Sequence, residues 1–175
     1  QGISMGAGLA HLAELGMVKN RPLPSIYLGP GFTDDEAAAA LEDANVPYEK
    51  PADIAETVAE LLAHGHVIAR CAGRMEYGLR ALGNRSILSK ADDPSVNNWL
   101  NARLNRTEFM PFAPVTMAEH VEECFVGMKG GELAARYMTI TFGISDILKR
   151  RSPGVVHLDN TARPQIIHEE DNPEY

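Results

Sequence analysis

The residues best suited to chemistry lie in one short segment, residues 73–86, whose sequence is GRMEYGLRALGNRS. The segment holds three arginines, one glutamate and three glycines, and its few apolar residues follow neither a helical nor a strand period. Core packing does not require this composition, because an arginine is costly to bury alone and its guanidinium suits bidentate binding of phosphate or carboxylate. Glycines between the arginines let the backbone approach a ligand closely.

We therefore interpret residues 73–86, the arginine loop, as an anion-binding loop in which Glu76 orients an arginine or a polar ligand group. The alternative is a surface loop held by Arg–Glu pairs. The charge distribution favours the first interpretation. The 175 residues include 16 Lys and Arg against 24 Asp and Glu, a net charge of −8. Residues 70–106 nevertheless contain seven basic and three acidic residues, so this stretch carries +4 and the rest −12.

An acidic chain with one local basic stretch fits a small anionic ligand better than a nucleic acid, whose non-specific binding usually requires a basic face across the domain. No apolar run reaches the length of a membrane span. The two cysteines, Cys71 and Cys124, form no metal-ligand spacing and suit reduced thiols in a cytosolic protein. We expect no metal site in this chain, and a bound nucleotide would use neither a GxGxxG nor a P-loop cradle.

A second polar cluster occupies residues 157–163, with the sequence HLDNTAR. It places an imidazole, a carboxylate, a hydroxyl and a guanidinium within seven residues. Two interpretations stay open: a turn held by internal hydrogen bonds, or a second part of the anion site.

The elements that position these residues alternate irregularly. We expect helices at residues 7–16, 37–44 (after a capping box of Thr33 and Glu36), 54–62 (ending at Gly65), 94–104 and 118–125. We expect strands at residues 66–71, 86–89, 112–117, 136–142, 155–158 and 164–168. The first strand leads directly into the arginine loop, a usual place for functional loops in α/β folds. On helix 94–104, the polar row of Asn97, Asn101 and Asn105 is expected to face solvent; the alternative is that Asn101 and Asn105, one turn apart, reach a ligand. The pattern predicts a single α/β domain, a mixed sheet with flanking helices.

These motifs resemble the NodU/CmcH/TobZ carbamoyltransferases. The segments GRMEYGLRALGNRSIL, EFMPFAP and HLDNTARPQ stand in the order of the family's GRxEFGPRALGxRSIL, FRPFAP and HVDGTARxQ. The match covers roughly residues 65–167, and residues 2–9 resemble the end of the family's preceding actin-like domain. The resemblance implies that residues 1–20 are the tail of that domain with a linker. It also implies that residues 21–175 are the YrdC-like C-terminal domain, a twisted α/β sheet around a positively lined cavity, cut before its last motif.

In activity, the resemblance implies that this domain forms carbamoyl adenylate from carbamoyl phosphate and ATP, with Mg. The actin-like domain, which holds the family's metal, then passes the carbamoyl group to an acceptor hydroxyl. The expected partners are these two small molecules and the chain's own N-terminal actin-like domain, with no nucleic acid and no membrane, in the cytoplasm. The isolated domain is expected to be inactive. The alternative is a non-catalytic module that binds a nucleotide or phosphate, or only docks its partner domain.

Residue by residue, the resemblance assigns Arg80 to the arginine that contacts the anionic substrate. It assigns substrate or ATP binding to Arg74, Glu76, Asn84, Arg85 and Ser86 in the arginine loop, and to His157, Asp159, Thr161 and Arg163 in the second cluster.

This sequence departs from the family at two cations that meet carbamoyl phosphate: Asn105 replaces a lysine and Met110 an arginine. We expect Arg106, with Arg103 as the second choice, to take over this catalytic role and to line one cavity with Arg80. Asn105 is then expected beside the substrate. Two milder departures are Leu79 for proline and Asn160 for glycine; asparagine also tolerates the left-handed backbone conformation.

Overall fold

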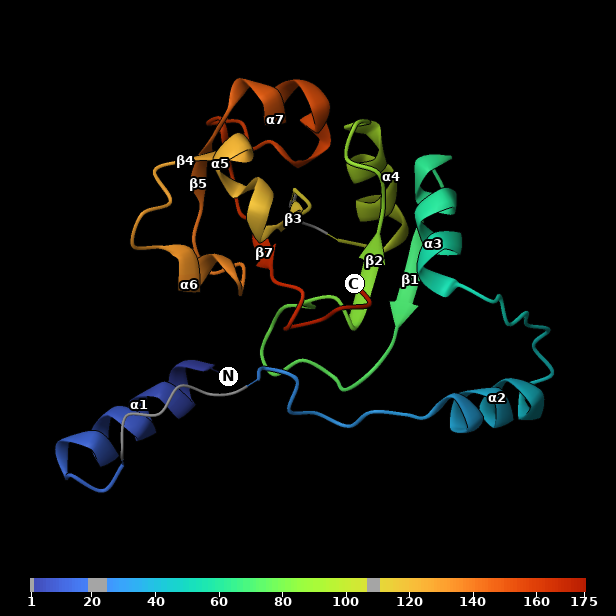
Figure 1. Ribbon diagram of the computed structural model, residues 1–175, viewed down its shortest axis with the longest axis horizontal. Helices are drawn as coiled ribbons and strands as arrows, with labels where there is room; N and C mark the ends of the chain where they lie inside the picture. The colour runs from blue at the N-terminus through green and yellow to red at the C-terminus, as the bar shows by residue number, and fades with distance from the viewer. Residues whose placement is uncertain (1, 19–24, 107–110) are drawn as a thin grey trace. The chain divides into compact units, whose positions relative to one another are not determined.

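The computed structural model describes residues 2–18, 25–106 and 111–175. The chain divides into two compact units, Gln1–Lys50 with Arg70–Ser86 and Pro51–Ala69 with Ile87–Tyr175. The helices shown in Figure 1 are α1 (Gly2–Glu14), α2 (Asp34–Asp43), α3 (Ile54–Ala63), α4 (Ser95–Arg103), α5 (Val121–Cys124), α6 (Glu132–Ala135) and α7 (Asp146–Arg151), with 3-10 turns η1 (Ala118–His120) and η2 (Pro153–Val155). The strands are β1 (Ile68–Cys71), β2 (Arg85–Leu88), β3 (Val115–Met117), β4 (Phe125–Val126), β5 (Phe142–Ile144), β6 (Thr161–Ala162) and β7 (Gln165–Ile167).

The described strands form three small sheets. Strand β1 pairs with β2, and β3 runs parallel to β7 with Val115 opposite Gln165. Strands β4, β5 and β6 are antiparallel, with Phe125 opposite Ile144 and Phe142 opposite Ala162. The predicted α/β class with mixed strand pairing is confirmed, and the strands are distributed over several short sheets.

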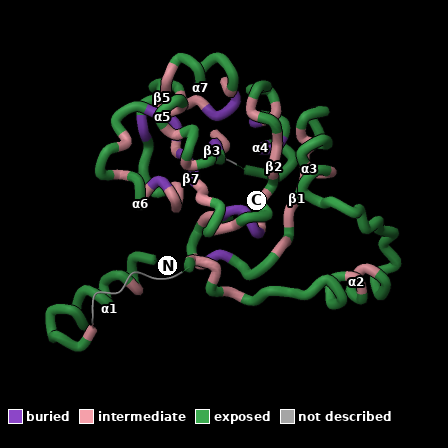
Figure 2. The backbone as a smooth tube through the Cα atoms, viewed as in Figure 1, coloured by how far each residue is buried: buried purple, intermediate pink, exposed green. Residues whose placement is uncertain are grey.

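The hydrophobic core of the second unit forms where β4, β5, β6 and β7 meet α6 and α7. Its buried members are Phe125, Ala135, Phe142, Leu148, Ala162 and Ile166. Helices α5 and α7 lie side by side next to this sheet (Figure 1). By contrast, helices α1, α2 and α3 contain no buried residue and are almost entirely exposed in Figure 2.

The helix ends follow the local sequence closely. The predicted capping box is present: the Thr33 hydroxyl accepts from the Glu36 N–H (3.2 Å), and the Glu36 carboxylate accepts from the Thr33 N–H (2.8 Å). Gly16 and Gly65 end α1 and α3 with left-handed φ values of 68° and 85°, as predicted.

Helix α4 ends in the same way, with an asparagine in place of glycine. Asn105 adopts φ 51° and its N–H bonds the Ala102 carbonyl (3.2 Å), while the Arg106 N–H bonds the Asn101 carbonyl (2.9 Å). This pair of bonds is a Schellman motif, which satisfies the last carbonyls of the helix. Asn105 therefore has a backbone role whatever its side chain binds.

Two predicted strands are wrong. Residues 136–141 form turns, because Met138 takes a left-handed φ of 52° and the Thr139 N–H and hydroxyl both donate to the Ala134 carbonyl at the end of α6. The predicted strand 155–158 is replaced by η2, which Pro153 opens. Alternating apolar residues predicted strands at both places, but local hydrogen bonds satisfy the backbone there instead.

The prediction that Asn97 and Asn101 of α4 face solvent is also wrong. Asn97 and Asn101 are each only 7% exposed, and the Asn97 amide donates to the Gly154 carbonyl. Helix α4 packs against η2 there, so a buried amide satisfies a carbonyl that no helix or strand would satisfy.

Candidate functional site

The arginine loop is organised around the carboxylate of Glu76, which is only 8% exposed. Its Oε1 accepts hydrogen bonds from three backbone N–H groups, those of Leu82 (2.8 Å), Asn84 (2.7 Å) and Arg85 (3.1 Å). The Gly83 N–H donates to the Ser86 hydroxyl (3.0 Å). Every N–H of residues 82–85 is therefore satisfied inside the loop, and a protein carboxylate occupies the place where these amides would otherwise bind an anion.

Two of the loop's arginines bind backbone carbonyls. Arg85 donates to the Ala72 and Asn84 carbonyls (both 2.7 Å), and its guanidinium lies 5.9 Å from the centre of the Phe32 ring. Arg74 donates to the carbonyls of Leu28 (2.9 Å) and Gly29 (3.0 Å). These contacts fix the path of the loop, and both guanidinium charges remain available to act on a ligand through space.

Asn84 and the glycines complete the loop's shape. The buried Asn84 amide donates to the Arg74 carbonyl (2.8 Å) and accepts from Arg70 (3.0 Å), so it joins both sides of the loop. Gly78 and Gly83 adopt φ values of 127° and 116°, which side-chain-bearing residues rarely take. The glycine content predicted such conformations.

Arg80 differs from the other two arginines of the loop. It is half-buried, and its guanidinium makes no hydrogen bond or ion pair with any described residue. It belongs to a four-residue arch, residues 78–81, whose backbone N–H groups also form no hydrogen bond within the described part of the chain. Leu79 in this arch is 81% exposed. The arch therefore combines backbone N–H groups that form no hydrogen bond among the described residues with a guanidinium that forms none either.

The second cluster is a turn held by its own side chains. The Thr161 hydroxyl donates to Asp159 (2.8 Å) and lies 3.0 Å from His157 Nδ1, and the His157 N–H bonds the Thr161 carbonyl (2.8 Å). Asn160 takes φ 59° and its side chain accepts from Lys149 (2.6 Å). Of the two interpretations left open, the hydrogen-bonded turn describes these contacts, while ligand binding by His157, Asp159 and Thr161 stays a prediction.

The remaining predicted residues lie in the second unit. Arg163 is half-buried directly after β6, and Asn105 is exposed. Arg106 is exposed, with its guanidinium 5.7 Å from the centre of the Phe112 ring, and Met110 lies outside the described residues. Arg80 belongs to the first unit, so its approach to Arg106 in one cavity stays a prediction.

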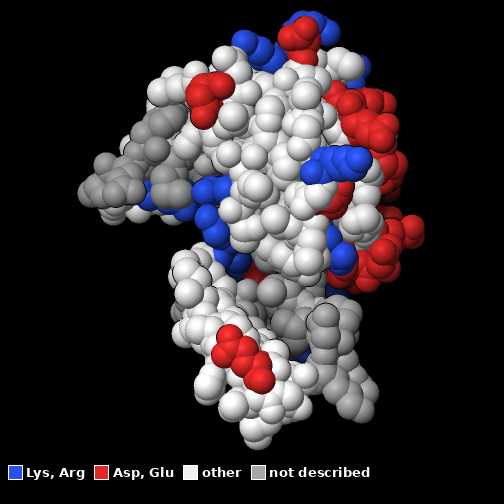
Figure 3. Space-filling view, turned by 90° about the vertical axis from the view of Figure 1, so that its left-hand side faces the viewer, with Lys and Arg blue, Asp and Glu red and all other residues white. Residues whose placement is uncertain are grey.

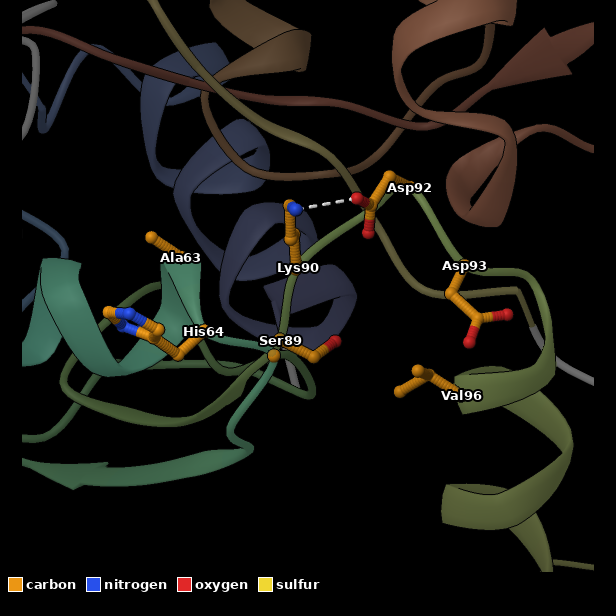
Figure 4. A pocket seen from close by; sticks show the side chains of 8 residues that line it. Ala63, His64, Ser89, Lys90, Asp92, Asp93 and Val96 are labelled. Atoms are coloured by element: carbon orange, nitrogen blue, oxygen red, sulfur yellow. Dashed lines mark ion pairs between the residues drawn. The ribbon is translucent and has the colours of Figure 1, made fainter.

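A pocket of about 370 Å³ lies elsewhere in the second unit (Figure 4). Its main feature is an ion pair between Lys90 and Asp92 (2.7 Å), which neutralises the pocket's lysine. The lining residues are Ala63, His64, Gly65, Ser89, Lys90, Asp92, Asp93 and Val96, and none of them is a predicted site residue. The chemistry of the arginine loop is therefore separate from this pocket.

The surface charges match the acidic composition. Figure 3 shows acidic side chains gathered along one side of the face in view and basic side chains in separate groups. Among the described residues, no group of three His, Cys, Asp or Glu is placed to hold a metal ion. None of the helices within residues 2–18, 25–106 and 111–175 is long and apolar enough to cross a membrane.

Replacing Glu76 by alanine should loosen the arginine loop. Hydrogen bonds to a charged acceptor contribute about 1.5–3 kcal/mol each, so the amides of Leu82, Asn84 and Arg85 should exchange with solvent at least ~10-fold faster. Glu76→Gln keeps an acceptor and should lie between alanine and wild type, and Glu60→Ala on the exposed side of α3 is the control. Unchanged exchange in Glu76→Ala, measured by NMR, would contradict the central role of this carboxylate.

The turn at residues 157–161 should respond to acid through Asp159. The hydrogen bonds from the Thr161 hydroxyl and N–H hold the pKa of Asp159 below its ordinary value of 3.8. Because the pKa of Asp159 is depressed in the folded protein, the stabilisation of the turn by its carboxylate is complete above the pKa of the unfolded state. This stabilisation is lost as the pH falls through the folded pKa. The carboxyl-carbon resonance of Asp159 itself should stay constant from about pH 7 to 5 and shift only below about pH 4. Thr161→Ala removes the hydroxyl and should move the midpoint of that shift upward, and a wild-type midpoint above pH 5 would contradict the assignment.

The residues of both motif clusters lie in the part of the chain that is similar to known proteins. The family model described as "Carbamoyltransferase C-terminus" matches residues 59–175, which include the whole arginine loop and the second cluster. An uncharacterized protein of Methanocaldococcus jannaschii is 33% identical over 184 residues, covering 99% of this chain and 29% of that protein.

Two further relatives are named as nodulation proteins. Nodulation protein NolO of Bradyrhizobium diazoefficiens is 32% identical over 99% of this chain and 32% of its own length. Nodulation protein U of Azorhizobium caulinodans is 39% identical over 63% of this chain and 19% of its own length. The chain thus spans about a third or less of these relatives. Since the family model covers more than half of the chain and includes both motif clusters, the chain belongs to the carbamoyltransferase C-terminal family.

Proposed function

We propose that the complete protein is an O-carbamoyltransferase, and that this chain supplies the site where carbamoyl phosphate, water and ATP give carbamoyl adenylate, with phosphate and pyrophosphate as the leaving products. Membership of the family supports carbamoyl transfer. The observation that carries the proposal is Arg80, a guanidinium with no partner among the described residues, on an arch with free backbone N–H groups. This donor set fits phosphate oxygens, and Mg²⁺ would be held largely by the ATP phosphates themselves.

The surrounding loop explains why Arg80 is suited to this role. A cation stabilises developing charge best when it is already in place and needs no reorganisation. Glu76 fixes the backbone at residues 82–85, and Arg74 and Arg85 fix carbonyls on both sides of the arch. Arg80 would then bind the anionic substrate, while Arg74 and Arg85 add positive potential around it.

Transfer to an acceptor hydroxyl needs more than this chain. We assign that step, and the family's metal, to an actin-like domain N-terminal to residues 21–175, with residues 1–20 as its tail. Helix α1 supports this assignment, because its apolar side chains are unusually exposed: Ile3 is 89% exposed, and Leu9 and Leu12 are also open. A helix with such a surface is normally covered by another part of the protein.

The proposal also gives Arg106 a role. The family's lysine and arginine at the carbamoyl phosphate are replaced by Asn105 and Met110, and a phosphate dianion in a closed site needs a cation. Arg106 donates the last backbone N–H of the Schellman motif that ends α4, and its guanidinium lies 5.7 Å from the centre of the Phe112 ring.

The function is tested first with Arg80→Ala in the complete protein. We expect kcat/KM for carbamoyl-phosphate-dependent pyrophosphate release from ATP to fall at least ~100-fold, a loss of ~2.7 kcal/mol. Arg80→Lys should recover only part, since it keeps the charge and loses the bidentate geometry. Arg150→Ala, on the exposed last turn of α7, is the matched control. Near-wild-type turnover by Arg80→Ala would remove Arg80 from the site, whereas a complete wild-type protein without carbamoyl-phosphate-dependent turnover would favour the non-catalytic binding or docking module.

Arg106→Ala tests the replacement cation. We expect the KM for carbamoyl phosphate to rise about 10-fold or more, with the KM for ATP little changed. Arg103→Ala tests the second-choice cation, whose guanidinium also lies 5.7 Å from an aromatic ring centre, that of Trp99. This variant should leave the KM for carbamoyl phosphate unchanged if Arg106 takes the role. An unchanged KM for carbamoyl phosphate in Arg106→Ala removes this residue from the site.

A further inference from the structure

We propose that residues 25–32 belong to the anion site, with Tyr27 and Gly29 as positioning residues for Arg80. This segment, SIYLGPGF, is called here the clamp segment. It lies outside residues 59–175, which the family model matches, and none of the predicted site residues belongs to it. The inference rests on the proposed function, since it deepens the role of the arginine loop.

The clamp segment lies along the arginine loop like a neighbouring strand. The Gly29 N–H donates to the Met75 carbonyl (2.9 Å), and the Met75 N–H donates to the Pro30 carbonyl (2.8 Å). The Tyr77 N–H donates to the Ile26 carbonyl (2.9 Å). Three backbone hydrogen bonds therefore join two segments that are far apart in the sequence.

Side chains add three more hydrogen bonds between the same segments. Arg74 donates to the carbonyls of Leu28 and Gly29, and the Tyr27 hydroxyl donates to the Leu82 carbonyl (2.9 Å). Both residues that flank the arch are thus bound to the clamp segment, Tyr77 through its N–H and Leu82 through its carbonyl. Residues 78–81, with Arg80, span the gap between these two fixed ends.

The contact is too close for a side chain at position 29. A Cβ added to Gly29 would lie 2.7 Å from the Met75 Cβ and 3.0 Å from the Met75 carbonyl oxygen. Any other residue there would push the clamp segment away from the loop. Glycine at this position is therefore explained by the approach to the arginine loop.

The clamp segment contributes little to a hydrophobic core. All of residues 25–32 are exposed or half-buried. The long-range hydrogen bonds described above join this segment to the arginine loop, so loosening them should affect the arch more than the global stability of the protein. This difference separates a positioning role from a general structural one.

The test compares Tyr27→Phe and Gly29→Ala with two matched controls in the complete protein. Tyr48→Phe removes a hydroxyl 3.3 Å from Glu42, and Gly143→Ala adds a Cβ whose nearest neighbour is 3.6 Å away. The first readout is amide exchange, which needs no ligand. In Gly29→Ala the Met75 and Tyr77 amides should exchange at least ~10-fold faster, and in the controls they should not.

The second readout is the affinity for ATP by calorimetry and the kcat and KM of carbamoyl-phosphate-dependent turnover. Removing the Tyr27 hydroxyl removes one hydrogen bond, so kcat/KM should fall about 5–10-fold, mainly in kcat. The same change in an Arg80→Ala background should cost less than about 2-fold, because Tyr27 acts through Arg80. Melting temperatures should stay close to those of the controls.

The outcomes separate the two proposals. The first outcome is a wild-type protein that turns over while ATP affinity, turnover rate and amide exchange are unchanged in Tyr27→Phe and Gly29→Ala. That outcome overturns the positioning role of the clamp segment and leaves the proposed function standing. Faster exchange with unchanged ATP affinity and rate also overturns the positioning role. ATP binding that weakens in both variants, in a protein without carbamoyl-phosphate-dependent turnover, supports the clamp and overturns the function. A wild-type protein that neither binds ATP nor turns it over overturns both.

Discussion

The arginine loop depends on the carboxylate of Glu76. One oxygen accepts hydrogen bonds from three backbone N–H groups of residues 82–85, a stretch that precedes strand β2 and shares only Arg85 with it. A buried carboxylate is tolerated only when its charge is met by donors, and buried amides only when they meet an acceptor. Each requirement satisfies the other here. The result is a rigid backbone in a segment whose composition alone would suggest a flexible surface loop.

This arrangement distributes the roles of the arginines. Arg85 and Arg74 satisfy carbonyls that the irregular backbone leaves over, so their side chains serve the shape of the loop as well as its potential. Arg80 stands on the arch, where no described residue competes for its donors. An anion-binding loop in an acidic protein thus uses several cations but exposes one guanidinium to direct contact, which limits the charge repulsion that several free arginines would cause.

At the end of α4, too, a residue at a predicted site position serves the backbone structure. Asn105, which stands where related sequences are expected to place a lysine, holds the left-handed position that ends the helix. The change removes a cation from the site and supplies a residue that tolerates positive φ. Arg106 follows at once, so the chain direction after the helix, and with it the direction of the next cation, is set by a backbone motif.

The sequence by itself determined the local features. The capping box of Thr33 and Glu36, the ends of α1 and α3 at Gly16 and Gly65, and the α/β class follow from neighbouring residues, because caps and amphipathic periods act over a few positions. The arginine and glycine content of residues 73–86 likewise indicated an anion site, and the motif order indicated the family.

Only the tertiary structure decided which donors of that site are free. The partners of Arg74 and the Tyr27 hydroxyl lie 45 to 55 residues away along the chain, and no local pattern encodes such pairs. The buried Asn97 depends on a carbonyl 57 residues away for the same reason. Residues 136–142 had the alternation of a strand, yet hydrogen bonds to the Ala134 carbonyl and a left-handed Met138 gave turns at residues 136–141, and only Phe142 joins a strand. Burial and long-range hydrogen bonds, rather than residue type, selected among the conformations that the local sequence allowed.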